Sequence, residues 1–129
     1  MAQIKIYGLK SNLDKNKTLI SKAIHDSVMS ALKYPKEKKF HRFIAMEIDF
    51  FIYPDDRTIN YLIIEISMFE GRSIDAKKEL IHNIYVNIQN DMGIFANDVE
   101  ITISETPKEN RGIHGLPADE LKLSYKVDV

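Results

Sequence analysis

The residues best suited to carry chemistry lie at one corner of the chain, Gly71-Arg72-Ser73. An arginine guanidinium can bind a carboxylate or a carbonyl oxygen through two parallel hydrogen bonds. Gly71 allows the backbone to turn tightly, and Ser73 can accept a hydrogen bond from the first free N–H groups of a helix. The corner therefore predicts an arginine that binds a negatively charged oxygen. The alternative is a structural arginine paired with Glu70 or with a helix C-terminus.

The sequence around this corner predicts a strand that leads into a helix. Apolar residues alternate with mixed ones on the preceding strand. The apolar face contains Leu62, Ile64, Ile66 and Met68. After the corner, Asp75 lies in the first turn of the predicted helix, where a negative charge is favourable.

A similar strand, turn and helix occur earlier in the chain, at a spacing of 61 residues. Asn12 matches Ser73 as the N-cap candidate, so we predict a first helix from about Leu13 to Lys33. Tyr34-Pro35 and Gly93-Ile94 are the corresponding stop signals. The chain is thus predicted to contain two strand-helix-strand units.

The remaining strands complete this prediction. We expect them at residues 2–9, 40–53 and 99–104, with a turn at 53–57 between the units. The predicted fold is α+β (α/β): repeats of about 2–53 and 59–105 form a four-stranded sheet with two helices on one face, in a single domain of residues 1–129. The uncovered face would then expose Phe43, Phe51, Ile63 and Phe69, so we expect it to be covered by other subunits.

The C-terminal arm, residues 106–129, is predicted to contain no helix. Proline and glycine interrupt its first half, and the second half alternates like a strand. The apolar positions of that strand are Leu121, Leu123, Tyr125, Val127 and Val129. We expect this strand to add to the sheet edge of a neighbouring subunit.

Composition excludes several classes of protein. The net charge of -1 gives no basic surface for nucleic acid, and the absence of cysteine excludes disulfides and thiolate metal sites. Because no apolar run is long enough to span a membrane and no signal-peptide pattern is present, we expect a cytoplasmic protein. His25 and His82 lack a second ligand at metal spacing, so we expect no metal site. There is no glycine-rich phosphate loop, and we expect no cofactor.

His41 and Arg42 are adjacent candidates at the start of the second predicted strand. Histidine titrates near neutral pH when it is unperturbed, so His41 could serve a site across a subunit boundary. The alternative is a packed or ion-paired residue, with Glu47 as the partner.

Several motifs together resemble the tautomerase superfamily, in particular its longer members related to 4-oxalocrotonate tautomerase and malonate semialdehyde decarboxylase. They are the repeated units, the corner Phe69-Glu-Gly-Arg-Ser73 with Lys77-Lys78, the loop 93–100 and the tail 105–110. The resemblance covers nearly the whole chain. It implies the tautomerase (MIF-like) fold, a homotrimer with its sheets facing inward, and active sites near subunit boundaries.

The resemblance also implies roles for individual residues. Family enzymes use an amino-terminal proline as base, acid or nucleophile, and Ala2 stands at that position. If Met1 is removed, Ala2 offers a primary amine with an ordinary pKa of about 7.7 to 8.0. Arg72 stands where the family places an arginine that binds the substrate.

Two further positions depart from the family pattern. Lys38 stands where the decarboxylase-like members have an aspartate, which argues against hydration or decarboxylation. Arg111 replaces an aromatic residue that forms a pocket wall in close relatives. With Arg42 and His41, these two residues are our candidates for substrate binding.

Three hypotheses follow. The first is a tautomerase that interconverts the keto and enol forms of a small keto acid, with the Ala2 amine moving the proton and Arg72 binding the oxyanion or carboxylate. The second is a trimer of the same fold that has lost the chemistry and binds a small anion or a protein. The third is a ferredoxin-like fold without a trimer.

Overall fold

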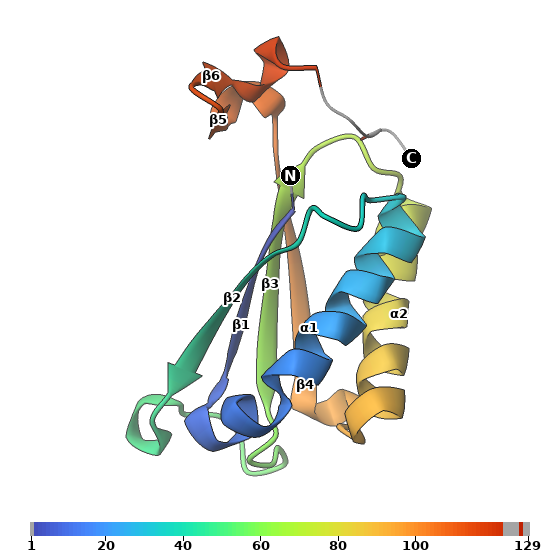
Figure 1. The fold of residues 1–129 in the computed structure, drawn as a ribbon. Coiled ribbons are helices and arrows are strands. Elements are labelled where there is room, and N and C mark those ends of the chain that lie inside the picture. Colours follow the sequence, from blue (N-terminus) through green and yellow to red (C-terminus); the bar gives the residue numbers. More distant parts are fainter. Residues whose placement is uncertain (1, 123–126, 128–129) are drawn as a thin grey trace.

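A four-stranded sheet with both helices on one face forms the body of the molecule (Figure 1). The computed structural model describes residues 2–122 and Val127. The strands are β1 (Gln3–Leu9), β2 (Phe40–Met46), β3 (Leu62–Phe69) and β4 (Val99–Thr106), and the helices are α1 (Lys10–Leu32) and α2 (Ile74–Met92). This arrangement confirms the predicted fold class. Neither α1 nor α2 is apolar enough over its length to cross a membrane, and this holds for the described residues only.

The sheet order is β2-β1-β3-β4. β1 runs parallel to β2 and antiparallel to β3, and β3 runs parallel to β4. The register aligns His41, Ile4, Ile66 and Ile103 in one row across the sheet. Since Ile4 and Ile66 are buried in the core below the helices, the whole row faces α1 and α2.

This register overturns part of the predicted uncovered face. Phe43 aligns with the buried Ile6 and packs against the core, so its predicted place on the uncovered face is wrong. The reason is that side-chain direction in β2 follows the pairing with β1, which local alternation does not reveal. Phe69 is also not exposed, because Ala118 and Val127 cover it.

The two helices begin in different ways. The Ser73 hydroxyl accepts a hydrogen bond from the Ala76 N–H at 3.1 Å, which confirms the predicted N-cap of α2. α1 begins at Lys10, directly after β1, and its N-cap residue Leu9 makes no side-chain cap. Asn12 therefore lies inside the helix, and its predicted role as N-cap is wrong. Its amide donates to the carbonyl of Asn60 at 3.1 Å instead.

β2 is shorter than predicted. It ends at Met46, and the segment that follows turns back so that the ring of Phe51 packs 5.4 Å from Tyr61. Tyr53 joins the same cluster at 5.0 Å from Tyr61. Three aromatic rings at these distances stabilise each other, which explains why the alternating pattern does not continue as a strand. β4 extends two residues beyond the predicted end, to Thr106.

Short elements complete the chain. These are the 3-10 helices η1 (Ile48–Phe50), η2 (Ala96–Asp98), η3 (Lys108–Asn110) and η4 (Ala118–Glu120), and the paired strands β5 (Gly112–Ile113) and β6 (Leu116–Pro117). The predicted terminal strand lies mostly outside the described residues. Val127, the one described residue beyond Lys122, is buried against Phe69 of its own chain.

Candidate active site

The Ala2 nitrogen lies in a buried position at the start of β1. Ala2 is only 2% exposed, and its N–H donates a hydrogen bond of 2.8 Å to the hydroxyl oxygen of Tyr34. Tyr34 follows the C-terminal end of α1 and is itself buried. The protein thus encloses the nitrogen that would become an amine if Met1 were removed.

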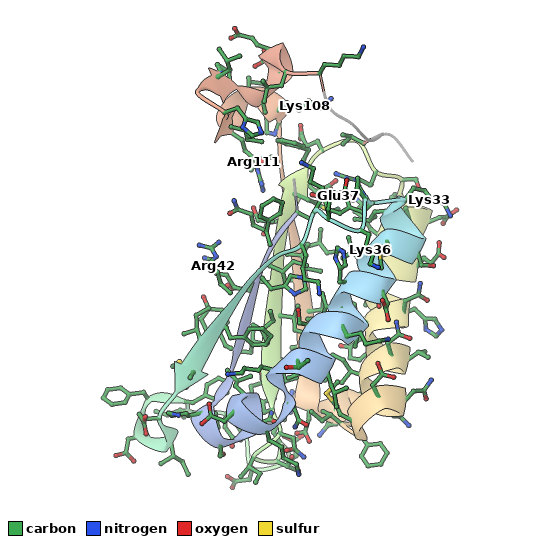
Figure 2. All side chains as sticks on the ribbon, in the orientation of Figure 1. Lys33, Lys36, Glu37, Arg42, Lys108 and Arg111 are labelled. Carbon is green, nitrogen blue, oxygen red and sulfur yellow. The ribbon has the colours of Figure 1, made fainter. Side chains whose placement is uncertain are left out.

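Arg42 and Arg111 lie on the face of the sheet opposite the helices (Figure 2). Arg42 Nη2 donates to Gln3 Oε1 at 3.3 Å, and Gln3 directly follows Ala2. Arg111 Nη2 donates to the hydroxyl of Ser67, which pairs with Gln3 across the sheet. Both guanidinium groups therefore bind side chains of the Gln3–Ser67 pair, which is the next residue position along the sheet from Ala2.

Arg111 makes two further contacts that fix its place. Its Nε donates to Thr106 Oγ1 at 2.9 Å, and its guanidinium lies 5.3 Å from the centre of the Phe69 ring. A cation over an aromatic face is attracted by the electrons of the ring. The arm after β4 thus returns Arg111 to the sheet end where β1 begins.

Arg72 lies at the predicted corner and is buried. Gly71 has a φ of 127°, which other residues rarely adopt, and this turn brings Arg72 back towards β3. Arg72 Nη1 donates to the carbonyl oxygen of Phe69 at 3.3 Å. Since Phe69 lies two residues beyond Ser67, Arg72 and Arg111 contact the same end of β3.

His41 does not share the orientation of Arg42. It lies on the helix-facing side, where Nδ1 is 2.7 Å from the Ser21 hydroxyl of α1. Burial, together with the nearby His25 and Lys39, lowers the pKa of His41 to about 4. The prediction that His41 titrates near neutral pH is therefore wrong, because the β2 register places it against the core.

Lys38 lies in the loop between α1 and β2. Its backbone N–H donates to the carbonyl of Pro35 at 3.1 Å, which closes a turn directly after Tyr34. In Figure 2, Lys33, Lys36 and Glu37 of this region lie near the C-terminal end of α1. The loop that carries Lys38 is thus the same loop that carries the partner of Ala2.

Two surface cavities meet at Gln3. One, of about 370 Å³, is lined by Gln3, Lys39, Phe40, His41 and Arg42. The other, of about 290 Å³, lies on the uncovered face and is lined by Gln3, Lys5, Glu65, Ile66, Ser67, Thr102 and Ser104. A small molecule at the start of β1 would have space on both sides of this residue.

The uncovered face also contains a carboxylate beside a phenol. A hydrogen bond to Glu65 raises the pKa of Tyr7, and the negative charge of Glu65 acts in the same direction. Arg42 aligns with Lys5, and Lys5 aligns with Glu65, in one row of the sheet. Within residues 2–122 and Val127, no group of three or more His, Cys, Asp or Glu side chains is placed to hold a metal ion.

Sequence analysis missed three residues of this region, namely Tyr34, Gln3 and Ser67. Around Tyr34 the sequence indicates only a helix stop, because nothing local shows that its hydroxyl reaches residue 2. Gln3 and Ser67 look like ordinary polar positions on mixed strand faces. Their importance follows from the antiparallel pairing of β1 with β3.

The Ala2 nitrogen enclosed at the start of a β-α-β unit, with arginines at the same sheet end, is the arrangement that the resemblance to the tautomerases implies. The sequence pattern of a family described as "Tautomerase enzyme" matches residues 38–114, which is more than half of the chain. The chain belongs to this tautomerase family. It is also similar to 2-hydroxymuconate tautomerase of Comamonas testosteroni, with 39% identity over 57 residues, 44% of this chain and 90% of that protein.

Solved structures share the fold at lower identity. FG41 malonate semialdehyde decarboxylase inhibited by 3-bromopropiolate is 23% identical, with a TM-score of 0.76 over 85% of this chain and 87% of that one. Native fused 4-OT is 15% identical, with a TM-score of 0.79 over 92% and 98%. A symmetric trimer of fused 4-OT is 18% identical, with a TM-score of 0.77 over 91% and 96%.

Proposed function

We propose that this protein is a tautomerase that interconverts the keto and enol forms of a small keto acid. In this proposal Met1 is removed and the Ala2 amine moves the proton. Arg72 binds the oxyanion or the carboxylate of the substrate, and Arg42, Lys38 and Arg111 contribute further positive charge. No cofactor takes part.

The observation that carries the proposal is the buried Ala2 nitrogen at the end of the sheet where Arg42, Arg72 and Arg111 are also held. Burial disfavours the charged ammonium form of an amine, and nearby arginines act in the same direction. Both effects favour the neutral form of an Ala2 amine, which is the form that can take up a proton. General bases work best when their pKa lies near the working pH.

The chemistry that the arrangement supports has two proton transfers. In the keto-to-enol direction, the neutral amine takes a proton from the carbon next to the carbonyl, and the electron pair moves to the carbonyl oxygen. The positive charge of Arg72 stabilises the resulting oxyanion. The ammonium then returns the proton to that oxygen, which gives the enol and restores the amine.

The proposal includes a homotrimer. One relative of the same fold is a trimer by its description, and the chain leaves large apolar side chains exposed at the β2 end. Their exposed fractions are 71% for Ile48, 77% for Phe50 and 93% for Ile52. Contact between subunits would remove these side chains from water, which is a favourable change.

The alternative function is a trimer that binds a small anion or a protein without catalysis. Two observations favour it. Ala2 stands where the resemblance expects a proline. Arg72 is buried and bonded to the Phe69 carbonyl, as expected for a structural corner residue.

The test begins with the intact mass of untagged protein, followed by turnover of an oxalocrotonate-type dienol and a phenylpyruvate-type enol on the same sample. We expect a mass without Met1, measurable turnover, and loss of turnover by at least about 100-fold in Arg72→Ala, the scale for losing an oxyanion-stabilising group. Size-exclusion chromatography with light scattering should give the same oligomer for both proteins.

Arg57→Ala is the matched control. Arg57 also lies in a turn before a strand, but its guanidinium binds Asp56 at 2.6 Å and Glu100 at 2.7 Å at the opposite end of the sheet. Its removal should leave turnover unchanged. Retained Met1, or an Arg72→Ala variant as active as the control, would contradict the proposed mechanism, and absence of turnover in the unmodified chain would favour the binding module.

A further inference from the structure

We propose that Tyr34 is a positioning residue for the amino-terminal amine: its hydroxyl accepts a hydrogen bond from the Ala2 nitrogen and turns the lone pair of that nitrogen towards the substrate. This inference rests on the proposed function, because it assigns a role within the same site. Nothing in the sequence pattern around Tyr34-Pro35 beyond a helix stop points to it. The hydrogen bond between Ala2 and Tyr34, which are 32 residues apart, is the observation that points to this role.

The geometry of the contact supports this role. The distance of 2.8 Å between Ala2 N and Tyr34 Oη is that of a good hydrogen bond. Ala2 is 2% exposed and Tyr34 5% exposed, so water has little access to compete for either atom. A primary amine has several N–H groups and one lone pair. When one N–H points at the Tyr34 oxygen, the rotation of the amine is restricted and the direction of the lone pair is set.

The loop that carries Tyr34 is ordered by its own backbone and by a contact with α1. Lys33, the residue before it, adopts a left-handed backbone with a φ of 54°. His25 of α1 lies with Nε2 2.7 Å from the carbonyl oxygen of Lys36. The N–H of Lys38 donates to the carbonyl of Pro35. A positioning group is effective only when its own place is fixed, and this loop meets that condition.

The hydroxyl also acts differently on the two forms of the amine. A hydrogen bond from an ammonium is charge-assisted and stronger than one from a neutral amine. Tyr34 therefore stabilises the ammonium that forms after the amine has taken a proton from the substrate. Removal of the hydroxyl should make the amine a weaker base as well as a less ordered one.

The experiment compares wild type with Tyr34→Phe, which keeps the ring in the core and removes only the hydroxyl. The α-amine is labelled competitively with acetic anhydride between pH 5 and 9, and the modified N-terminal peptide is quantified by mass spectrometry. We expect the midpoint for the amine to fall by about one pH unit in Tyr34→Phe, the scale of a lost charge-assisted hydrogen bond. On the dienol substrate, kcat should fall about tenfold or more, with a smaller change in KM.

Tyr85→Phe is the matched control. The Tyr85 hydroxyl donates to the Val99 carbonyl at 2.8 Å, at the far end of α2 from Tyr34. This variant also loses one tyrosine hydrogen bond, but neither the amine midpoint nor kcat should change. If Tyr34→Phe does not fold by circular dichroism, Tyr34→Met tests the same expectation, since methionine adapts to an irregular core space.

The outcomes separate this inference from the proposed function. An amine midpoint and a kcat in Tyr34→Phe equal to those of Tyr85→Phe would overturn the role of Tyr34, even if the wild type turns over substrate. If the amine midpoint falls in Tyr34→Phe but the wild type shows no turnover, the result would support the contact with Tyr34 and contradict the tautomerase. A retained Met1 would overturn both, because Ala2 would then carry an amide.

Discussion

The two strand-helix-strand units have the same order of elements but connect strand to helix in different ways. In the second unit, four residues separate β3 from α2, and they form the corner that holds Arg72. In the first unit, β1 continues into α1 without any intervening residue. At the spacing of 61, Gly71, Arg72 and Ser73 of this corner match Lys10, Ser11 and Asn12, which lie in the first turn of α1. A repeat in sequence thus provides a binding corner only once.

The units also differ in what their outer strands contribute to the core. In the row across the sheet, the second unit supplies Ile103 from β4, whereas the first supplies His41 from β2. The helix ends differ as well, since Gly93 ends α2 and Lys33 ends α1, both in left-handed conformations. Both ends of α2 follow local signals, whereas α1 begins without a side-chain cap and ends at a lysine.

The largest expected effect on the free energy of unfolding comes from the protonation of His41. The folded protein holds the pKa of His41 at about 4, below the ordinary value of 6.5. The unfolded chain therefore binds a proton first as the pH falls, and the free energy of unfolding should decrease between pH 6.5 and 4, by at most ~3 kcal/mol. Above pH 6.5 this residue contributes no pH dependence.

Urea unfolding at several pH values and one protein concentration checks this prediction. His41→Gln should flatten the decrease between pH 6.5 and 4. His82→Gln, on the exposed side of α2, serves as the control. Its free energy of unfolding should decrease between pH 6.5 and 4 as in the wild type. An unchanged slope in His41→Gln would mean that other groups cause the acid sensitivity.

The next effect compares the two residues that sequence analysis matched as N-caps. Asn12 is 4% exposed, donates to the Asn60 carbonyl, and accepts from Asn16 Nδ2 at 2.7 Å. Asn12→Ala would leave the buried Asn16 side chain and the part-buried Asn60 carbonyl without this partner and should cost about 2 kcal/mol. Ser73→Ala removes an ordinary cap and should cost about 1 kcal/mol.

Urea unfolding of both variants at the same protein concentration measures this difference. A larger decrease in the free energy of unfolding for Ser73→Ala than for Asn12→Ala would contradict the proposed difference between the two helix starts. It would mean that Asn12 contributes little to holding α1 against the segment before β3.

The smallest expected effect on stability comes from the residues that end the two helices. Lys33 has a φ of 54° and Gly93 a φ of 71°, a region in which glycine is favoured. Lys33→Gly should therefore stabilise the protein by about 0.5 to 1 kcal/mol, and Gly93→Ala should destabilise it by about 1 kcal/mol. A Cβ at Gly93 would meet no atom within 4 Å, so only the backbone conformation causes that loss.

Thermal unfolding of the two variants checks the signs. A Lys33→Gly variant that is less stable than wild type would show that the lysine side chain supports the loop before Tyr34. Its effect on turnover should be small, since the glycine adopts the same backbone conformation.

Much of the second unit could be predicted because its signals act over a few residues. The alternation of β3, the hydroxyl of Ser73 and the glycine at 93 each act on neighbouring backbone groups, and each prediction is confirmed. The same kind of reasoning failed at Asn12. There a better partner lies in a distant segment, the Asn60 carbonyl, 48 residues away.

The candidate site was predictable only in part, for the same reason. Sequence motifs pointed to Ala2, Arg72 and Arg111, but no local feature reveals that Tyr34 bonds the Ala2 nitrogen or that Arg111 reaches Ser67. The side of the sheet on which His41 and Phe43 lie was also hidden, because a shift of one residue in strand pairing reverses every side chain.

The sequence by itself therefore determined the elements, their order, the family and the arginine corner, since periodicity and capping are properties of neighbouring residues. The tertiary structure decided which face of β2 enters the core, what covers Phe69, and which hydroxyl meets the Ala2 nitrogen. These depend on contacts between segments tens of residues apart, such as the 44 residues between Ser67 and Arg111. Strand register and packing bring such segments together, and no local pattern encodes either one.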